Sequence, residues 1–145
     1  MVLGRSKWVH ISFVAAFLSS VGCASEALPE DSGEEALAIA TSMSGLLQVN
    51  ARTLDGKAPA RGANGFDLEI IQTGDDTALA GLTLTLTPWM PAMGHGTSVR
   101  PTVTEAGDGH YRAEDVYLFM PGLWELRISI DGTIEDDAAP RFQIR

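Results

Sequence analysis

The sequence predicts an all-β protein whose folded part is an immunoglobulin-like antiparallel β-sandwich of about seven strands. Three observations lead to this fold class. From Ser44 onward, apolar and polar residues alternate with a period of two, as in strands that bury one face. Turn-forming residues separate the alternating segments, and no apolar pattern of helical period and core length follows Ser44. The length of 145 residues suits one such domain.

The expected strands follow one another at short intervals. Five are marked by alternating apolar residues: Leu47, Val49 and Ala51; Phe66, Leu68 and Ile70; Leu82, Leu84 and Leu86; Trp124, Leu126, Ile128 and Ile130; and Phe142 and Ile144. Residues 101–105 and 111–119 complete the set. Tyr111 and Trp124 open two strands that fit one hairpin. Both aromatic side chains are expected in the core, with the Tyr111 hydroxyl bonded to a neighbouring loop.

The first 22 residues resemble a secretory signal. Arg5 and Lys7 give a positive start, and a short apolar run follows that is too short to span a membrane comfortably. Ser20-Val21-Gly22-Cys23 resembles a bacterial lipobox, with Ser20 where a leucine is usual. Lipidation of Cys23 would place the protein in the bacterial cell envelope as a lipoprotein facing the periplasm, with the lipid bilayer as partner. Cleavage after Ala24 is the alternative and would give a soluble secreted protein.

Residues 23–43 are expected to form an acidic tether before a domain at 44–145. Five acidic residues and no Lys or Arg lie between residues 24 and 43, which disfavours packing in a core. The apolar stretch 36–40 within this segment could form a short helix or an edge strand. The formal charge of the chain is −9 and becomes more negative once residues 1–22 are removed, which argues against nucleic acid as a partner.

The stretch Met90-Pro91-Ala92-Met93-Gly94-His95 is the strongest candidate for a metal site. Thioether ligands are soft and favour Cu(I) among biological metals. Proline at the second position favours a turn whose first and fourth residues, here Met90 and Met93, lie close together. Glycines on both sides of His95 leave the backbone free to bring the imidazole to the same point. One loop could therefore supply two sulfurs and one nitrogen to Cu(I); a solvent-facing loop histidine is the alternative for His95.

Strand direction predicts which other side chains lie near this loop. If successive strands run in opposite directions, residues 82–87 and 111–119 both end at the same end of the sandwich. Met120 is then a possible fourth copper ligand, although it could equally cap the core as a gap-filling methionine. His110 lies at the opposite end and is not expected to be a ligand. Trp89 could lie over a bound Cu(I) or cover the top of the core.

The same residues resemble the YtkA-like domain family, which is related to the domain of the FixH protein. The motifs concerned are Gly62-Ala63-Asn64-Gly65-Phe66, Met90 to His95, Gly109-His110-Tyr111, Met120 and Gly122-Leu123-Trp124. The resemblance covers roughly residues 44–145. It implies an exported immunoglobulin-like sandwich linked with copper handling and respiratory oxidase maturation. The chain departs from the FixH type, which keeps a membrane helix where a lipid anchor is expected here.

These observations lead to two functional hypotheses. The first is an exported Cu(I)-binding carrier or chaperone that passes copper to an envelope protein and serves respiratory oxidase assembly or copper homeostasis. The second is an interaction module of a cell-envelope assembly with no metal, in which the methionines form an adaptable contact patch. An enzyme is not expected, because the sequence holds no metalloprotease, zinc-cysteine, serine-hydrolase or phosphate-loop motif.

Overall fold

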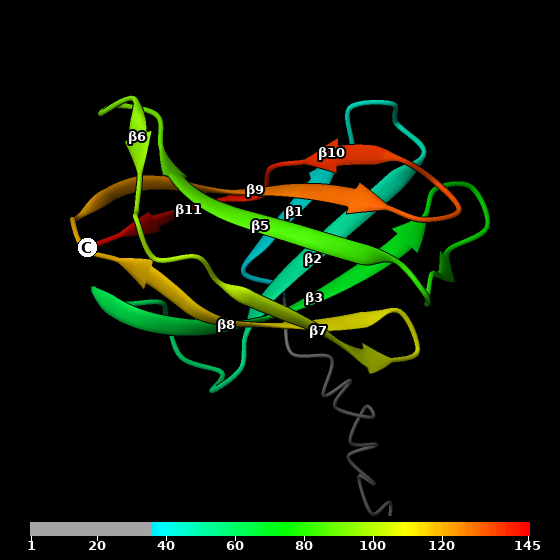
Figure 1. The fold of residues 1–145 in the computed structure, drawn as a ribbon, viewed down its shortest axis with the longest axis horizontal. Coiled ribbons are helices and arrows are strands. Elements are labelled where there is room, and N and C mark those ends of the chain that lie inside the picture. The colour runs from blue at the N-terminus through cyan, green and yellow to red at the C-terminus, as the bar shows by residue number, and fades with distance from the viewer. Residues whose placement is uncertain (1–35) are drawn as a thin grey trace, which may run out of the picture. The chain divides into compact units, whose positions relative to one another are not determined.

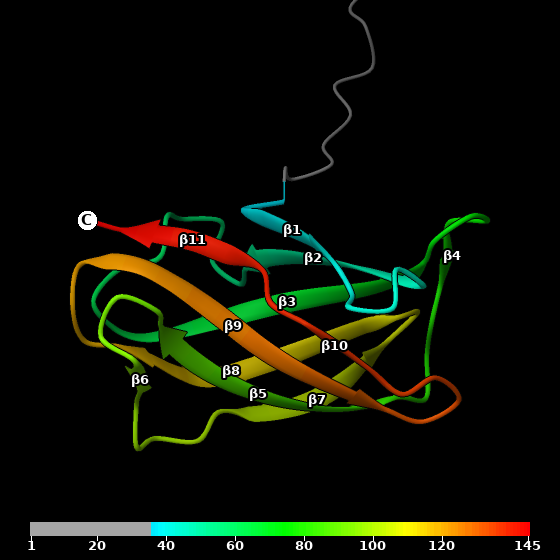
Figure 2. The same ribbon diagram turned by 90° about the horizontal axis from the view of Figure 1, so that it is seen from above.

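Two packed antiparallel sheets make up the part of the protein that the computed structural model describes, residues 36–145 (Figures 1 and 2). The expected signal at 1–22, the expected lipidation site Cys23 and the first part of the expected tether lie outside the described residues. Between residues 36 and 145 there is no helix of a length and hydrophobicity that could cross a membrane. The predicted all-β sandwich is confirmed.

The first sheet, here called sheet A, has the order β1-β2-β3-β8-β7, with β4 paired to β3. Its strands are β1 (Ala38–Thr41), β2 (Leu47–Thr53), β3 (Gly62–Gln72), β4 (Thr77–Ala78), β7 (Thr102–Gly107) and β8 (His110–Leu118). The second sheet, sheet B, has the order β10-β9-β5-β6, with β11 also paired to β9. Its strands are β5 (Thr83–Met90), β6 (His95–Gly96), β9 (Gly122–Asp131), β10 (Asp136–Ala138) and β11 (Arg141–Ile144).

All seven expected strands are present, as β2, β3, β5, β7, β8, β9 and β11, and four short strands add to them. One of the additions moves the start of the domain. Residues 38–41 form the edge strand β1, paired antiparallel with β2. Of the two alternatives for the apolar stretch 36–40, the edge strand is therefore the one that forms. The sandwich begins at Ala38, within the segment expected to be tether, rather than at Ser44.

The expected hairpin between the Tyr111 and Trp124 strands is wrong. β8 pairs with β3 and β7 in sheet A, whereas β9 pairs with β5, β10 and β11 in sheet B. The short connection 119–121 therefore passes from one sheet to the other at an end of the sandwich. Sequence proximity favours pairing of neighbouring strands, but here each strand pairs with a strand more distant in the sequence, β8 with β3 and β9 with β5.

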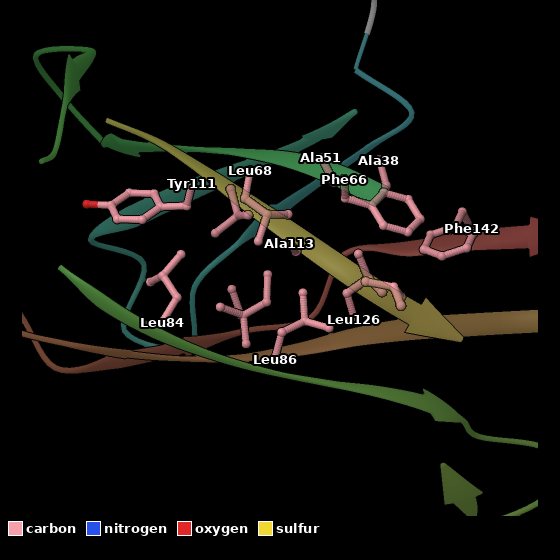
Figure 3. Packing of buried hydrophobic residues seen from close by; sticks show 14 of the residues in the cluster. Ala38, Ala51, Phe66, Leu68, Leu84, Leu86, Tyr111, Ala113, Leu126 and Phe142 are labelled. Atoms are coloured by element: carbon pink, nitrogen blue, oxygen red, sulfur yellow. The ribbon is translucent and has the colours of Figure 1, made fainter. Parts of the chain in front are cut away.

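The core lies between the sheets and is built from the inward side chains of both, as Figure 3 shows for Leu68 and Tyr111 of sheet A facing Leu84 and Leu126 of sheet B. Trp124, Leu84 and Leu126 are buried as predicted. The Tyr111 hydroxyl donates to the carbonyl oxygen of Leu79 at 2.8 Å and accepts from the amide of Leu82 at 3.1 Å. This confirms the expected bond to a neighbouring loop. Burial, opposed by that amide and reinforced by the carboxylate of Glu105, raises the pKa of Tyr111.

Candidate metal centre

The Met90–His95 segment is a tight turn between β5 and β6. The amides of Met93 and Gly94 both donate to the carbonyl oxygen of Met90, at 3.1 and 3.0 Å. Gly94 has a φ of +68°, a left-handed conformation that side chains other than glycine rarely adopt. The turn predicted from Pro91 is therefore present, and it brings the backbones of Met90 and Met93 together as expected.

Strand pairing sets Met90 and His95 directly opposite each other. They are paired residues of the β5–β6 ladder, so their side chains leave the sheet on the same side. That side faces the interior, because Met90 is only 4% exposed and follows Leu84 and Leu86 in the inward series of β5. The pairing gives the His95 ring the same direction as the Met90 thioether, at the rim of the core.

The turn between β8 and β9 lies against the turn between β5 and β6. A Cβ atom on Gly122 would clash with the Cε methyl of Met90, so the methionine end fills the space that the glycine leaves. Figures 1 and 2 show both turns at one end of the sandwich and the β7–β8 turn at the other. The prediction that Met120 shares an end with the Met90–His95 loop, away from His110, is thereby confirmed.

Phe119 makes the second contact between the two turns. The rings of His95 and Phe119 are nearly parallel, at 3° with centroids 6.1 Å apart. Phe119 in turn meets buried Trp124 edge to face at 5.4 Å, and the indole of Trp124 donates to the carbonyl oxygen of Met120 at 2.9 Å. The imidazole is thus held by a short chain of rings anchored in the core. Sequence reasoning missed Phe119; its position next to Met120 in the same turn was the available signal.

The hydrogen bond of His95 identifies the nitrogen that remains for a ligand. Its Nδ1 lies 3.1 Å from the carbonyl oxygen of Gly96. Because a carbonyl oxygen only accepts, the proton in this contact belongs to Nδ1, and the lone pair of a neutral ring lies on Nε2. A backbone carbonyl that fixes one ring nitrogen is the usual partner of a metal-binding histidine. His95 is exposed, so Nε2 can be reached from outside.

Met93 and Met120 differ in exposure. Met93 is 50% exposed at the tip of its turn. Met120 is partly buried and packs against the core, as a methionine that caps the core would. It nevertheless lies at the same end of the sandwich as Met90, Met93 and His95. Neither residues 88–99 nor residues 116–124 include a charged side chain. Four donors are thus carried on two touching turns that have no charged side chain of their own.

Trp89 does not take either of the places expected for it. It leaves β5 on the outer face of sheet B, where the guanidinium carbon of Arg127 lies 4.1 Å from its ring centroid. The reason is the alternation of the strand: Met90 points inward, so its neighbour must point outward. Trp89 therefore neither covers the top of the core nor lies over the turn that carries Met93.

His110 takes part in a polar network on the outer face of sheet A. Its Nδ1 lies 2.9 Å from Oδ2 of Asp67, and its Nε2 is 4.0 Å from Oε1 of Glu69. Burial raises the pKa of Glu69, but hydrogen bonds from Asn50 and Arg52 outweigh it and the pKa is lowered. Within residues 36–145, no group of three or more His, Cys, Asp or Glu side chains is arranged to hold a metal ion.

Comparison with known families decides the classification. The family model described as YtkA-like matches residues 47–129, more than half of the chain. The chain belongs to the YtkA-like family. The matched part of this YtkA-like protein runs from β2 into β9 and includes Met90, Met93, His95 and Met120. Searches among curated proteins and among solved structures gave no match.

Proposed function

We propose that this YtkA-like protein is an exported Cu(I)-binding carrier or chaperone of the bacterial cell envelope, lipid-anchored through Cys23 and facing the periplasm. Copper is the cargo and not a resident cofactor. In this proposal the protein passes Cu(I) to an envelope acceptor protein and serves respiratory oxidase assembly or copper homeostasis. The observation that carries the proposal is the junction of two turns that brings Met90, Met93, His95 and Met120 to one end of the sandwich.

The chemistry of these donors supports Cu(I) over other metals. Three thioethers and one imidazole form a soft set, whereas Zn(II) prefers thiolate, imidazole and carboxylate. Thioethers carry no proton at any ordinary pH, so only His95 must be neutral for binding. Two turns without charged side chains of their own suit a monovalent ion of low hydration better than a divalent one. Exposure of Met93 and His95 leaves two donors accessible from outside.

Burial of Met90 and exposure of Met93 suit a transfer role. A carrier must release its cargo to another protein, and exchange proceeds when ligands of the acceptor reach the ion before all ligands of the donor have left. Met93 and His95, at the surface, are the donors that an acceptor could replace first. Met90, held against Gly122, is the donor that would leave last.

A second candidate function is supported by a separate observation. Exposed apolar side chains at the same end, Met93, Phe119 and Leu123, form a surface suited to contact with another protein. In an interaction module without metal, these residues alone would matter. The two functions differ in one respect that is easily measured, the requirement for sulfur at residues 90 and 93.

Titration of the full chain with Cu(I) under reducing, anaerobic conditions tests the proposal, with Ag(I) as a spectroscopically simple substitute. We expect one equivalent of either ion to bind and to shift the His95 ring signals and the Met93 methyl signal in NMR spectra. Zn(II) added in the same range should leave those signals in place. Absence of Cu(I) binding, or binding that leaves residues 90–95 unperturbed, would favour the interaction module.

A further inference from the structure

A hollow of about 650 Å³ lies on the outer face of sheet B, the face opposite to the one on which the Met90 side chain is buried. Its floor is made by β5 and β9, which lie side by side in Figure 1, and one side is closed by β10. The β1–β2 turn forms a further wall, because the amide of Met43 donates to the carbonyl oxygen of Asp137 at 2.8 Å. The volume lies within the usual range of small-ligand sites, about 300–1,000 Å³.

One end of this hollow holds two arginines fixed by a buried carboxylate. Glu125 is 4% exposed, although it lies on the outer face, and its two carboxylate oxygens accept from Arg127 Nε at 3.1 Å and from Arg141 Nη2 at 2.9 Å. Trp89 supports the face of the Arg127 guanidinium at 4.1 Å. One carboxylate cannot neutralise two guanidinium groups, so this end carries a net positive charge. Each guanidinium has five N–H donors, and most of them are not used in the contact with Glu125.

The other end of the hollow is negative. Asp137 lines it and is exposed, and it pairs across the ladder with Ser129. Arg141 pairs with Glu125, four residues earlier on β9. At about 3.3 Å per residue, the Asp137–Ser129 pair and the Arg141–Glu125 pair, here called the two charged rows, lie roughly 13 Å apart along β9. Between them the lining is hydroxyl and apolar, from Thr85, Thr87, Ser129, Met43 and Ala139.

We infer that this hollow is a binding site for a short zwitterionic peptide of about three or four residues, lying along β9. Its carboxylate pairs with Arg127 and Arg141, because guanidinium groups bind carboxylates through paired N–H donors. Its terminal ammonium pairs with Asp137, and small side chains contact Met43 and Ala139. The separation of the two charged rows selects the length, since an extended peptide of this size spans about 10–13 Å. This inference is independent of the copper proposal.

Calorimetric titration of the full chain with tri-alanine tests the site. A ligand of this size at ordinary efficiency should bind with a dissociation constant on the order of 0.1–1 mM. Tri-alanine amide, which lacks the carboxylate, should bind at least about tenfold more weakly, as should tri-alanine to Arg141→Gln. Acetylated tri-alanine should lose about fivefold or more, and it should be insensitive to Asp137→Asn, which weakens only the peptide with a free ammonium.

Arg112→Gln and Asp115→Asn on sheet A change the net charge equally and should leave tri-alanine binding unchanged. The proposal is overturned if tri-alanine shows no saturable binding or if tri-alanine amide binds equally well. It is also overturned if these control variants lose as much affinity as Arg141→Gln and Asp137→Asn. Sensitivity at one end only also overturns it, because the ligand is then not selected as a zwitterion. If Arg141→Gln fails to fold by circular dichroism, the modified peptides and Asp137→Asn still decide the outcome.

Discussion

The Cε methyl of Met90 occupies the space in which a side chain of Gly122 would begin. Met90 is the last residue of β5 and Gly122 is the first residue of β9. Their contact therefore joins the β5–β6 turn to the β8–β9 turn. Gly122 also has a φ of +135°, which side chains other than glycine rarely adopt. The backbone conformation therefore favours glycine here, and the absence of a side chain leaves room for the end of a proposed copper ligand.

Gly122→Ala should destabilise the domain by about 1–3 kcal/mol, through overpacking against Met90 and backbone strain. Gly62→Ala is the matched control, because Gly62 also has a positive φ, +113°, but open space where its Cβ would lie. Urea unfolding of both variants gives the two losses of stability. The loss in Gly62→Ala reports backbone strain alone, and the excess in Gly122→Ala reports the steric clash with Met90. In a Met90→Ala background the excess cost of Gly122→Ala should vanish; an excess that persists would mean that Met90 is not the obstructing group.

Leu126→Ala should cost about 2–5 kcal/mol of unfolding free energy, because a fully buried leucine side chain leaves a cavity between the sheets. The matched control is Thr85→Ala, on the exposed face of the neighbouring strand, which should change stability by no more than about 0.5 kcal/mol. Chemical denaturation measures both. Similar losses of unfolding free energy in the two variants would contradict the placement of Leu126 on the inner face and Thr85 on the outer face of sheet B.

Acid should weaken the link between the β1–β2 turn and β10. Burial raises the pKa of Asp136, but hydrogen bonds from the Ser42 and Ser44 hydroxyls and from the amides of Asp137 and Ser44 outweigh it and lower the pKa to about 2, from 3.8. A lowered pKa means that the ionised form stabilises the fold. The contribution is complete above pH 3.8 and disappears as the pH falls toward 2.

The stability difference between the natural protein and Asp136→Asn should therefore shrink between those two pH values. Thermal unfolding of both proteins across this range measures it. Asp55→Asn, in an exposed turn on sheet A, serves as the control that carries the same change of charge. A difference that stays constant to pH 2 would show that the Asp136 carboxylate is not what the hydroxyl groups stabilise.

The period-two alternation was sufficient to predict β2, β3, β5, β9 and β11 and the residues that they bury, because each of these strands buries one face. It did not mark β7, none of whose residues is buried. It did not mark β4, β6 and β10, which have only two or three residues, and for the four-residue β1 it left a short helix open as an alternative. Strands this short form because a longer neighbour offers free backbone groups. The sheet membership of β8 and β9 was also missed, since pairing depends on contacts between residues far apart in the chain.

The proposed copper site was also predictable from the sequence only in part. The Met90–Met93 turn followed from Pro91 alone, because the relevant contacts are local. Strand direction placed Met120 at the correct end, since this depends only on counting strands. The contacts of His95 with Phe119 and of Met90 with Gly122 join residues that are far apart in the chain, so no local pattern encodes them.

Processing of the N-terminus remains a prediction that mass spectrometry of the protein from its native membrane can test. We expect a chain that begins at Cys23 and carries the mass of a diacylglycerol group, because the charged start, the short apolar run and Gly22-Cys23 together favour lipidation. Cys23→Ala should release the protein from the membrane fraction. A mature chain that begins at Ser25 without acyl mass would support soluble export instead.

The most direct test of the central claim is the Cu(I) affinity of Met93→Leu, measured by competition with a chromophoric Cu(I) chelator beside the natural protein and His110→Ala. Leucine keeps the size of Met93 and removes its sulfur, and His110 lies at the opposite end of the sandwich. We predict that Met93→Leu weakens Cu(I) binding at least about tenfold and that His110→Ala has no effect. Unchanged affinity in Met93→Leu together with loss of binding in His110→Ala would contradict the account.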